Sequence, residues 1–132
     1  MDVFARRSLL QGRPNPGGGA DYVSGLQGTL TPKSPTGSLD VTIRYVPGKL
    51  VLAPESFEDY LHLLEELDWP TLEDLATAIV KDISNEMLTR WSQVNVKSAQ
   101  SGLDHVATHE VTVEDQQPGW RNDDLIFRLP PI

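Results

Sequence analysis

The 132-residue chain contains no cysteine. This absence excludes disulfide bonds, thiolate metal ligands and cysteine nucleophiles together. The chain also has no apolar run of about 18 or more residues, the length that a membrane-spanning helix requires. At this length the sequence predicts one domain, large enough to bury a core of its own. We therefore expect a soluble cytoplasmic protein without a membrane partner.

Positive charge is scarce in the middle of the chain. The net charge is −8, and residues 50–80 contain acidic side chains but no lysine or arginine. Nucleic-acid binding requires a basic surface that displaces phosphate counterions, so this pattern disfavours a nucleic-acid partner. An acidic surface is compatible with a neutral or cationic ligand, and equally with solubility alone.

Prolines and glycines divide the chain into three parts. Residues 1–20 end in RPNPGGG, a run that favours neither a helix nor a central strand. We expect residues 1–20 to be a flexible N-terminal arm, residues 21–114 the folded domain and residues 115–132 a C-terminal tail. The arm and the tail are suited to wrapping around neighbouring subunits.

The clearest strand covers residues 38–46. Its apolar side chains alternate with polar ones and would form one buried face: Leu39, Val41, Ile43 and Tyr45. Such alternation is typical of an antiparallel sheet with one solvated face. Pro47-Gly48 predicts a turn that leads to a second short strand over residues 49–53. Residues 22–30 form a weaker candidate strand, which Gly25 and Gly28 interrupt.

Two helices are expected next, separated by Asp68-Trp69-Pro70. Ser56 is the predicted N-cap of the first helix, with Asp59 in the capping-box position. Thr71 is the predicted N-cap of the second helix, with Asp74 in the corresponding position. Both segments carry apolar residues at helical spacing.

Residues 91–96 and 103–114 are the last two predicted strands, with Gly102 between them. The complete order predicts an α+β domain, in which two consecutive helices cover one face of an antiparallel sheet. His105 and His109 would lie about 13 Å apart on the last strand, too far to share one ion. The sequence therefore predicts no metal site.

Three short segments together suggest a family: Leu30-Thr31-Pro32-Lys33, Glu55-Ser56 and Leu72-Glu73-Asp74. They resemble the Cys-Pro-Lys, Glu-Ser and His-Glu-Asp motifs of the QueF family, the 7-cyano-7-deazaguanine reductases of queuosine synthesis. The resemblance covers about residues 29–98. It implies the tunnelling fold, an antiparallel four-stranded sheet with two consecutive helices on one face. Members of this fold form homo-oligomeric rings and bind purines or pterins between subunits.

The resemblance also assigns roles to residues. Glu73 corresponds to the glutamate that grips the guanine-like edge of the substrate, with Glu55 and Ser56 as further contacts. Thr31 occupies the position of the nucleophilic cysteine, and Ser38 lies near that of the aspartate proton donor. The family reduces a cysteine thioimide with NADPH, so NADPH is implied by resemblance alone.

The change from cysteine to Thr31 alters the expected chemistry, because an unactivated hydroxyl does not replace a thiolate. We therefore expect a divergent QueF-like protein that binds a deazapurine or purine base and has lost or altered nitrile reduction. Two alternatives stay open. One is an enzyme of the same fold that acts on a pterin or deazapurine through acid/base chemistry, using Glu73 and a histidine of the last strand. The other is a non-enzymatic oligomeric scaffold.

Overall fold

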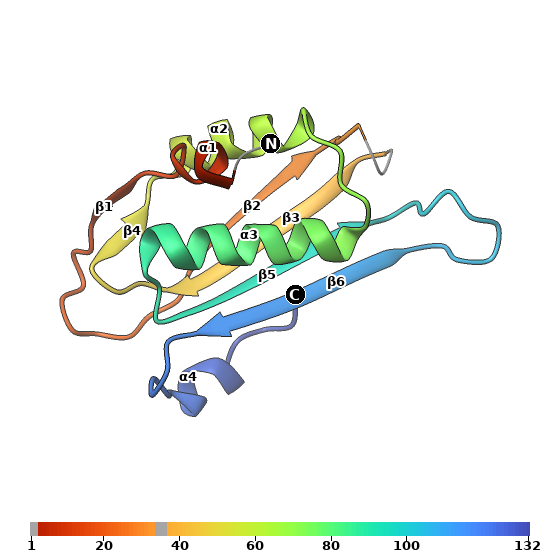
Figure 1. Cartoon of the computed structure of the whole chain (residues 1–132). Helices are drawn as coiled ribbons and strands as arrows, with labels where there is room; N and C mark the ends of the chain where they lie inside the picture. The colour runs from red at the N-terminus through yellow and green to blue at the C-terminus, as the bar shows by residue number, and fades with distance from the viewer. Residues whose placement is uncertain (1–2, 34–36) are drawn as a thin grey trace.

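The computed structural model describes residues 3–33 and 37–132. Residues 1–2 of the expected arm and 34–36 of the loop after Thr31 lie outside the described residues. Four strands form one antiparallel sheet in the order β2-β3-β5-β6 (Figure 1). They are β2 Ser24–Leu30, β3 Leu39–Val46, β5 Trp91–Ser98 and β6 His109–Gln116. The α+β architecture expected from the sequence is confirmed.

One face of this sheet packs into the hydrophobic core. The predicted apolar face of β3 is buried, and none of its members exceeds 1% exposure: Leu39, Val41, Ile43 and Tyr45. Val94 and Val96 of β5 pair with Ile43 and Val41, so they extend the same apolar face. Burying each such side chain stabilises the fold by about 1.5–3 kcal/mol.

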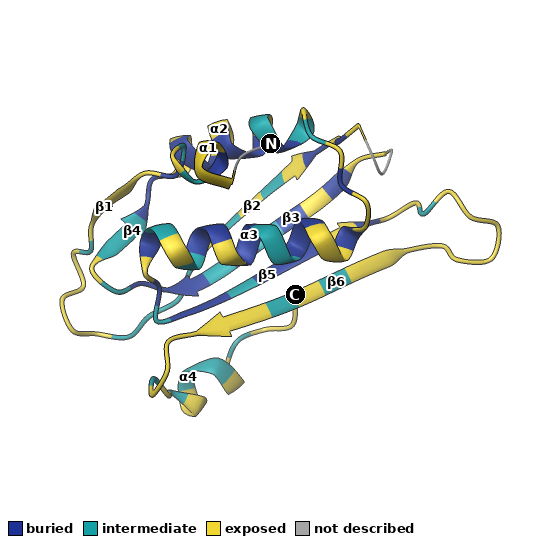
Figure 2. Cartoon of the chain, viewed as in Figure 1, coloured by how far each residue is buried: buried dark blue, intermediate teal, exposed yellow. Residues whose placement is uncertain are grey.

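Both long helices cover this face, as Figures 1 and 2 show. Helix α2 (Pro54–Glu65) lies over β2, and α3 (Leu72–Met87) lies over β5 and β6. Helix α3 starts as predicted, because the Thr71 hydroxyl accepts a hydrogen bond from the backbone N–H of Asp74 at 3.0 Å. This cap fixes the position of the first turn of α3.

The predicted start of the first helix was wrong. The observed N-cap is Ala53, three residues before Ser56, and Pro54 is the first residue of helix α2. Proline suits this position because it lacks the N–H that would have no partner there. Ser56 is therefore a buried residue inside the first turn, and its hydroxyl donates to the Ala53 carbonyl at 2.8 Å.

The strand after Pro47-Gly48 exists, but it does not join the main sheet. It is β4 (Leu50–Leu52), and it pairs antiparallel with β1 (Gly12–Pro14). Both sides of β3 are already occupied by β2 and β5, so β4 has no place beside it. The weaker candidate strand at residues 22–30 supplies the partner of β3 instead.

Residues 3–20, most of the expected N-terminal arm, contain α1 (Val3–Arg7) and β1 and contact their own chain. Helix α1 brings two arginines to Asp82 of α3, whose side chain is 0% exposed. The Nε atoms of Arg6 and Arg7 lie 2.9 Å and 2.8 Å from its carboxylate oxygens. The Tyr60 hydroxyl donates to the same carboxylate at 2.6 Å. Composition could not indicate this anchor, because it joins residues far apart in sequence.

The last strand is shorter than predicted, since β6 begins at His109 rather than at residue 103. His105 consequently lies in the loop before β6 and not on the sheet. The tail after β6 contains α4 (Asp123–Phe127). It runs along the sheet face opposite the helices, where Arg44 Nη1 donates to the Pro130 carbonyl at 2.6 Å.

Candidate functional site

Glu73 lies in the first turn of α3 with 61% of its side chain exposed. Its Oε2 atom is 3.3 Å from Nε2 of His109, the first residue of β6. The contact forms because α3 packs over β5 and β6, which places the start of the helix beside the start of β6. A helix N-terminus also favours negative charge through its exposed N–H groups.

Thr31 and Ser38 lie at the same end of the sheet. One rung of the sheet pairs Leu30 with Leu39, Leu39 with Ser98 and Ser98 with His109. Thr31 directly follows Leu30, the last residue of β2, and Ser38 directly precedes Leu39, the first residue of β3. Both Thr31 and Ser38 are exposed.

Thr31 and Glu73 nevertheless belong to opposite edges of that end. Strands β2 and β6 are the two edges of the sheet, about 14 Å apart at three strand spacings. The structure thus brings Glu73 and His109 into contact and leaves Thr31 on the far edge. A reaction that used both Thr31 and Glu73 on one small base would need a ligand spanning the whole sheet, or a second subunit.

Glu55 and Ser56 lie at the other end of the molecule, where α2 begins near β1 and β4 (Figure 1). The Glu55 carboxylate forms an ion pair with Arg13 of β1. The Ser56 hydroxyl accepts a hydrogen bond from the backbone N–H of Gln11 at 3.0 Å. In one chain, both residues therefore hold the N-terminal segment and do not approach Glu73.

The described residues contain no group of three or more His, Asp or Glu side chains arranged to hold a metal ion. His105 lies in the loop before β6, and His109 is the first residue of that strand. Within the same part of the chain, no helix has the length and apolar character needed to span a membrane.

Sequence reasoning identified Glu73 and also considered a histidine of the last strand as its partner. The contact itself joins residues 36 positions apart, and only the crossing of α3 over the sheet specifies it. The buried Asp82 was missed. Its position on the apolar stripe of α3, between Ile79 and Ile83, is the signal that could have revealed it.

Comparison with known proteins supports the fold. No family model matches this chain, and neither does any curated protein. Among solved structures, the chain is similar to the crystal structure of the archaeosine synthase QueF-Like in the apo form. The two chains share 21% sequence identity with a TM-score of 0.58, over 74% of this chain and 94% of the other. At this identity the similarity shows the fold, and this chain has the tunnelling fold of a QueF-like protein.

The Glu73–His109 pair offers two kinds of chemistry. A carboxylate has two acceptor oxygens, so it can accept parallel hydrogen bonds from the N–H and amino groups of a guanine-type base. An imidazole is the side chain best suited to exchange protons near neutral pH. The pair can therefore bind a base, transfer a proton, or do both.

Proposed function

We propose that this chain is a QueF-like protein that binds a purine or deazapurine base through Glu73. The observation that carries the proposal is the exposed Glu73 carboxylate, held at the start of α3 and 3.3 Å from His109. Its exposure leaves acceptor oxygens available to a ligand. The similarity in fold to a QueF-like archaeosine synthase supports the assignment of the class.

The position of Glu55 and Ser56 favours a site between subunits. Both lie at the opposite end of the molecule from Glu73, so they can join it only if a neighbouring subunit contributes them. We therefore propose a cytoplasmic homo-oligomer in which the Glu73 end of one subunit faces a neighbour. To contact a ligand there, the Ser56 hydroxyl would have to give up its hydrogen bond from the Gln11 N–H, or use the lone pair that this hydrogen bond leaves free.

Nitrile reduction through a thioimide is not part of the proposal. The chain has no thiol, and Thr31 is exposed at the edge of the sheet away from His109. NADPH would then have no covalent adduct to reduce. Purified protein mixed with 7-cyano-7-deazaguanine should not oxidise NADPH, and sustained turnover would contradict this view.

Thermal-shift measurements test the binding proposal. Guanine, 7-cyano-7-deazaguanine and neopterin are added separately, and a ligand at 100 times its Kd should stabilise the fold by about 2.7 kcal/mol. Glu73→Gln keeps the shape of the side chain but removes its charge, so it should abolish the shift. Glu58→Gln, an exposed position on α2, is the matched control and should keep it.

The absence of a shift with all three ligands would favour the scaffold alternative. An equal shift in the wild type and in Glu73→Gln would instead contradict binding through Glu73, because the base would then bind elsewhere.

The 3.3 Å contact also favours a second candidate, an enzyme that uses Glu73 and His109 for acid/base chemistry on a pterin or deazapurine. For such a substrate, His109→Gln should lower kcat and remove one limb of the pH–rate profile. His105→Gln is the control, because His105 lies in the loop before β6. Equal activity in the two variants would exclude the pair as the catalytic groups.

A further inference from the structure

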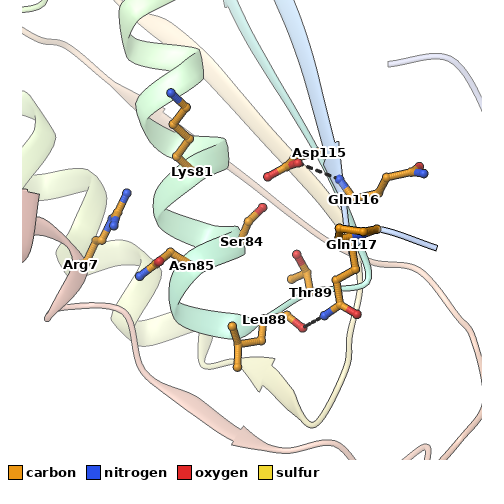
Figure 3. Close-up of a pocket in the computed structure, with 10 residues that line it drawn as sticks. Arg7, Lys81, Ser84, Asn85, Leu88, Thr89, Asp115, Gln116 and Gln117 are labelled. Carbon is orange, nitrogen blue, oxygen red and sulfur yellow. Dashed lines mark hydrogen bonds between the residues drawn. The ribbon is translucent and has the colours of Figure 1, made fainter. Parts of the chain in front are cut away.

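A pocket of about 540 Å³ lies over the last turns of α3 (Figure 3). Its walls come from α3, the residues that follow it, the end of β6 and Arg7 of α1. Small-molecule sites usually measure about 300–1,000 Å³. The pocket begins at Lys81, about 12 Å along the helix from Glu73 at the rise of about 1.5 Å per helical residue. It is therefore separate from the proposed base-binding site.

The pocket contains a buried hydroxyl that needs a partner. Thr89 is 4% exposed, and within the described residues its Oγ1 atom has no hydrogen-bond partner. Buried polar atoms are nearly always paired, and an unpaired one costs about 1–3 kcal/mol. Figure 3 shows Thr89 beside the gap between α3 and the end of β6. The Oγ1 atom has almost no accessible surface, so an oxygen atom of a ligand in this gap would complete its hydrogen bonding once the Thr89 side chain turns toward it.

Two cations line the same pocket in a chain whose net charge is −8. Lys81 has no ion-pair partner among the residues that the structure describes. Arg7 uses its Nε atom to bind Asp82, which leaves its terminal nitrogens for another acceptor. Lysine and arginine together are the usual partners of a phosphate group. The pocket therefore favours a ligand with an anionic group.

The remaining polar groups indicate that the ligand is more than an anion. Asp115, an exposed carboxylate at the end of β6, lines the pocket and would repel a second negative group. Its Oδ1 accepts from the backbone N–H of Gln116 at 2.9 Å, and its other oxygen can accept from a ligand hydroxyl. Ser84, whose hydroxyl is paired with that of Ser92 at 2.7 Å, adds a further hydroxyl to the wall.

We propose that this pocket binds a small hydroxyl-bearing phosphate ester, such as a sugar phosphate. The phosphate lies near Lys81 and Arg7, and the ligand hydroxyls lie near Thr89 and Asp115. The proposal stands on these contacts alone and does not depend on base binding at Glu73.

Calorimetric titration of the full chain with ribose 5-phosphate tests the proposal. We expect saturable binding, and binding at least about tenfold weaker for ribose or inorganic phosphate alone, because each lacks half of the contacts. Thr89→Val and Lys81→Met should each weaken binding of ribose 5-phosphate about fivefold or more. Lys97→Met on β5 is the matched control for the loss of a lysine, and Glu73→Gln is the control for the other site.

Three results would overturn the proposal. The first is no saturable heat with ribose 5-phosphate at millimolar concentration. The second is unchanged affinity in Thr89→Val, a variant that should fold normally because it removes only a buried hydroxyl without a partner. The third is equal binding of inorganic phosphate and the ester, which would indicate a simple anion site.

Discussion

Helix α3 carries two carboxylates that the fold treats in opposite ways. Asp82 is 0% exposed and binds Arg6, Arg7 and Tyr60, whereas Glu73 is 61% exposed and contacts His109. Burying a carboxylate destabilises a protein unless hydrogen-bond and ion-pair partners replace its interactions with water. An exposed one keeps its hydration and can exchange it for a ligand. The comparison separates a carboxylate that holds the structure together from one that is available for binding.

The largest expected effect comes from removing the buried carboxylate. Asp82→Ala leaves two arginines and a tyrosine without their common partner, so we expect a loss of about 3–5 kcal/mol in the free energy of unfolding. Glu73→Gln should change it by less than about 0.5 kcal/mol, because the side chain is exposed. Denaturant unfolding measures both. Similar losses of stability in the two variants would contradict the distinction between a structural Asp82 and an exposed Glu73.

The hydrogen bond from Tyr60 to Asp82 should give the next largest effect. Its loss in Tyr60→Phe should cost about 1.5–3 kcal/mol, because the acceptor is charged and buried. Burial raises the pKa of the Tyr60 phenol well above 10.0, and the negative charge of Asp82 raises it further.

The raised pKa also predicts a dependence on pH. The folded state holds the phenol proton more tightly than the unfolded state does. The stability that this difference contributes is therefore present below pH 10.0 and is lost as the pH rises above it. From pH 8 to 11, the free energy of unfolding should fall less steeply in Tyr60→Phe than in the wild type. Parallel curves would contradict the role of the Tyr60 phenol in this pH dependence.

A smaller effect is expected at the start of α3. Thr71→Ala removes the side-chain cap and should cost about 1 kcal/mol, whereas Thr71→Ser keeps the hydroxyl and most of the stability. Because Glu73 lies two residues later, Thr71→Ala should also lower the affinity for any ligand that Glu73 binds. A ligand affinity that is unchanged while stability falls would show that Glu73 does not depend on this cap.

The smallest effect concerns the attachment of the C-terminal segment. The hydrogen bond from Asn122 lowers the pKa of Asp21, and the ion pair with Arg90 adds to this effect. The stabilisation is therefore present above pH 3.8 and is lost as the pH falls below it. Hydrogen exchange should show the segment after β6 loosening on acidification, and Asp21→Asn should remove much of that change. A segment equally protected at pH 3 and pH 5 would contradict this role.

Local signals in the sequence identified much of the fold. The alternation in residues 38–46 gave the central strand, and Thr71 gave the start of α3, because each depends on residues that are neighbours along the chain. The N-cap of α2 was placed three residues too late, because Pro54 can start a helix without any side-chain cap. The pairing of β4 with β1 could not be predicted, since it depends on which edges of β3 were already occupied.

The sequence by itself determined that no thiol chemistry is available and that a carboxylate occupies the first turn of α3. Only the tertiary structure decided what each carboxylate does. The contact of Glu73 with His109 spans 36 residues, and that of Asp82 with Arg6 spans 76. Such contacts depend on the register of the sheet and on where a helix crosses it. These features arise from the packing of the whole core and not from any short stretch of chain.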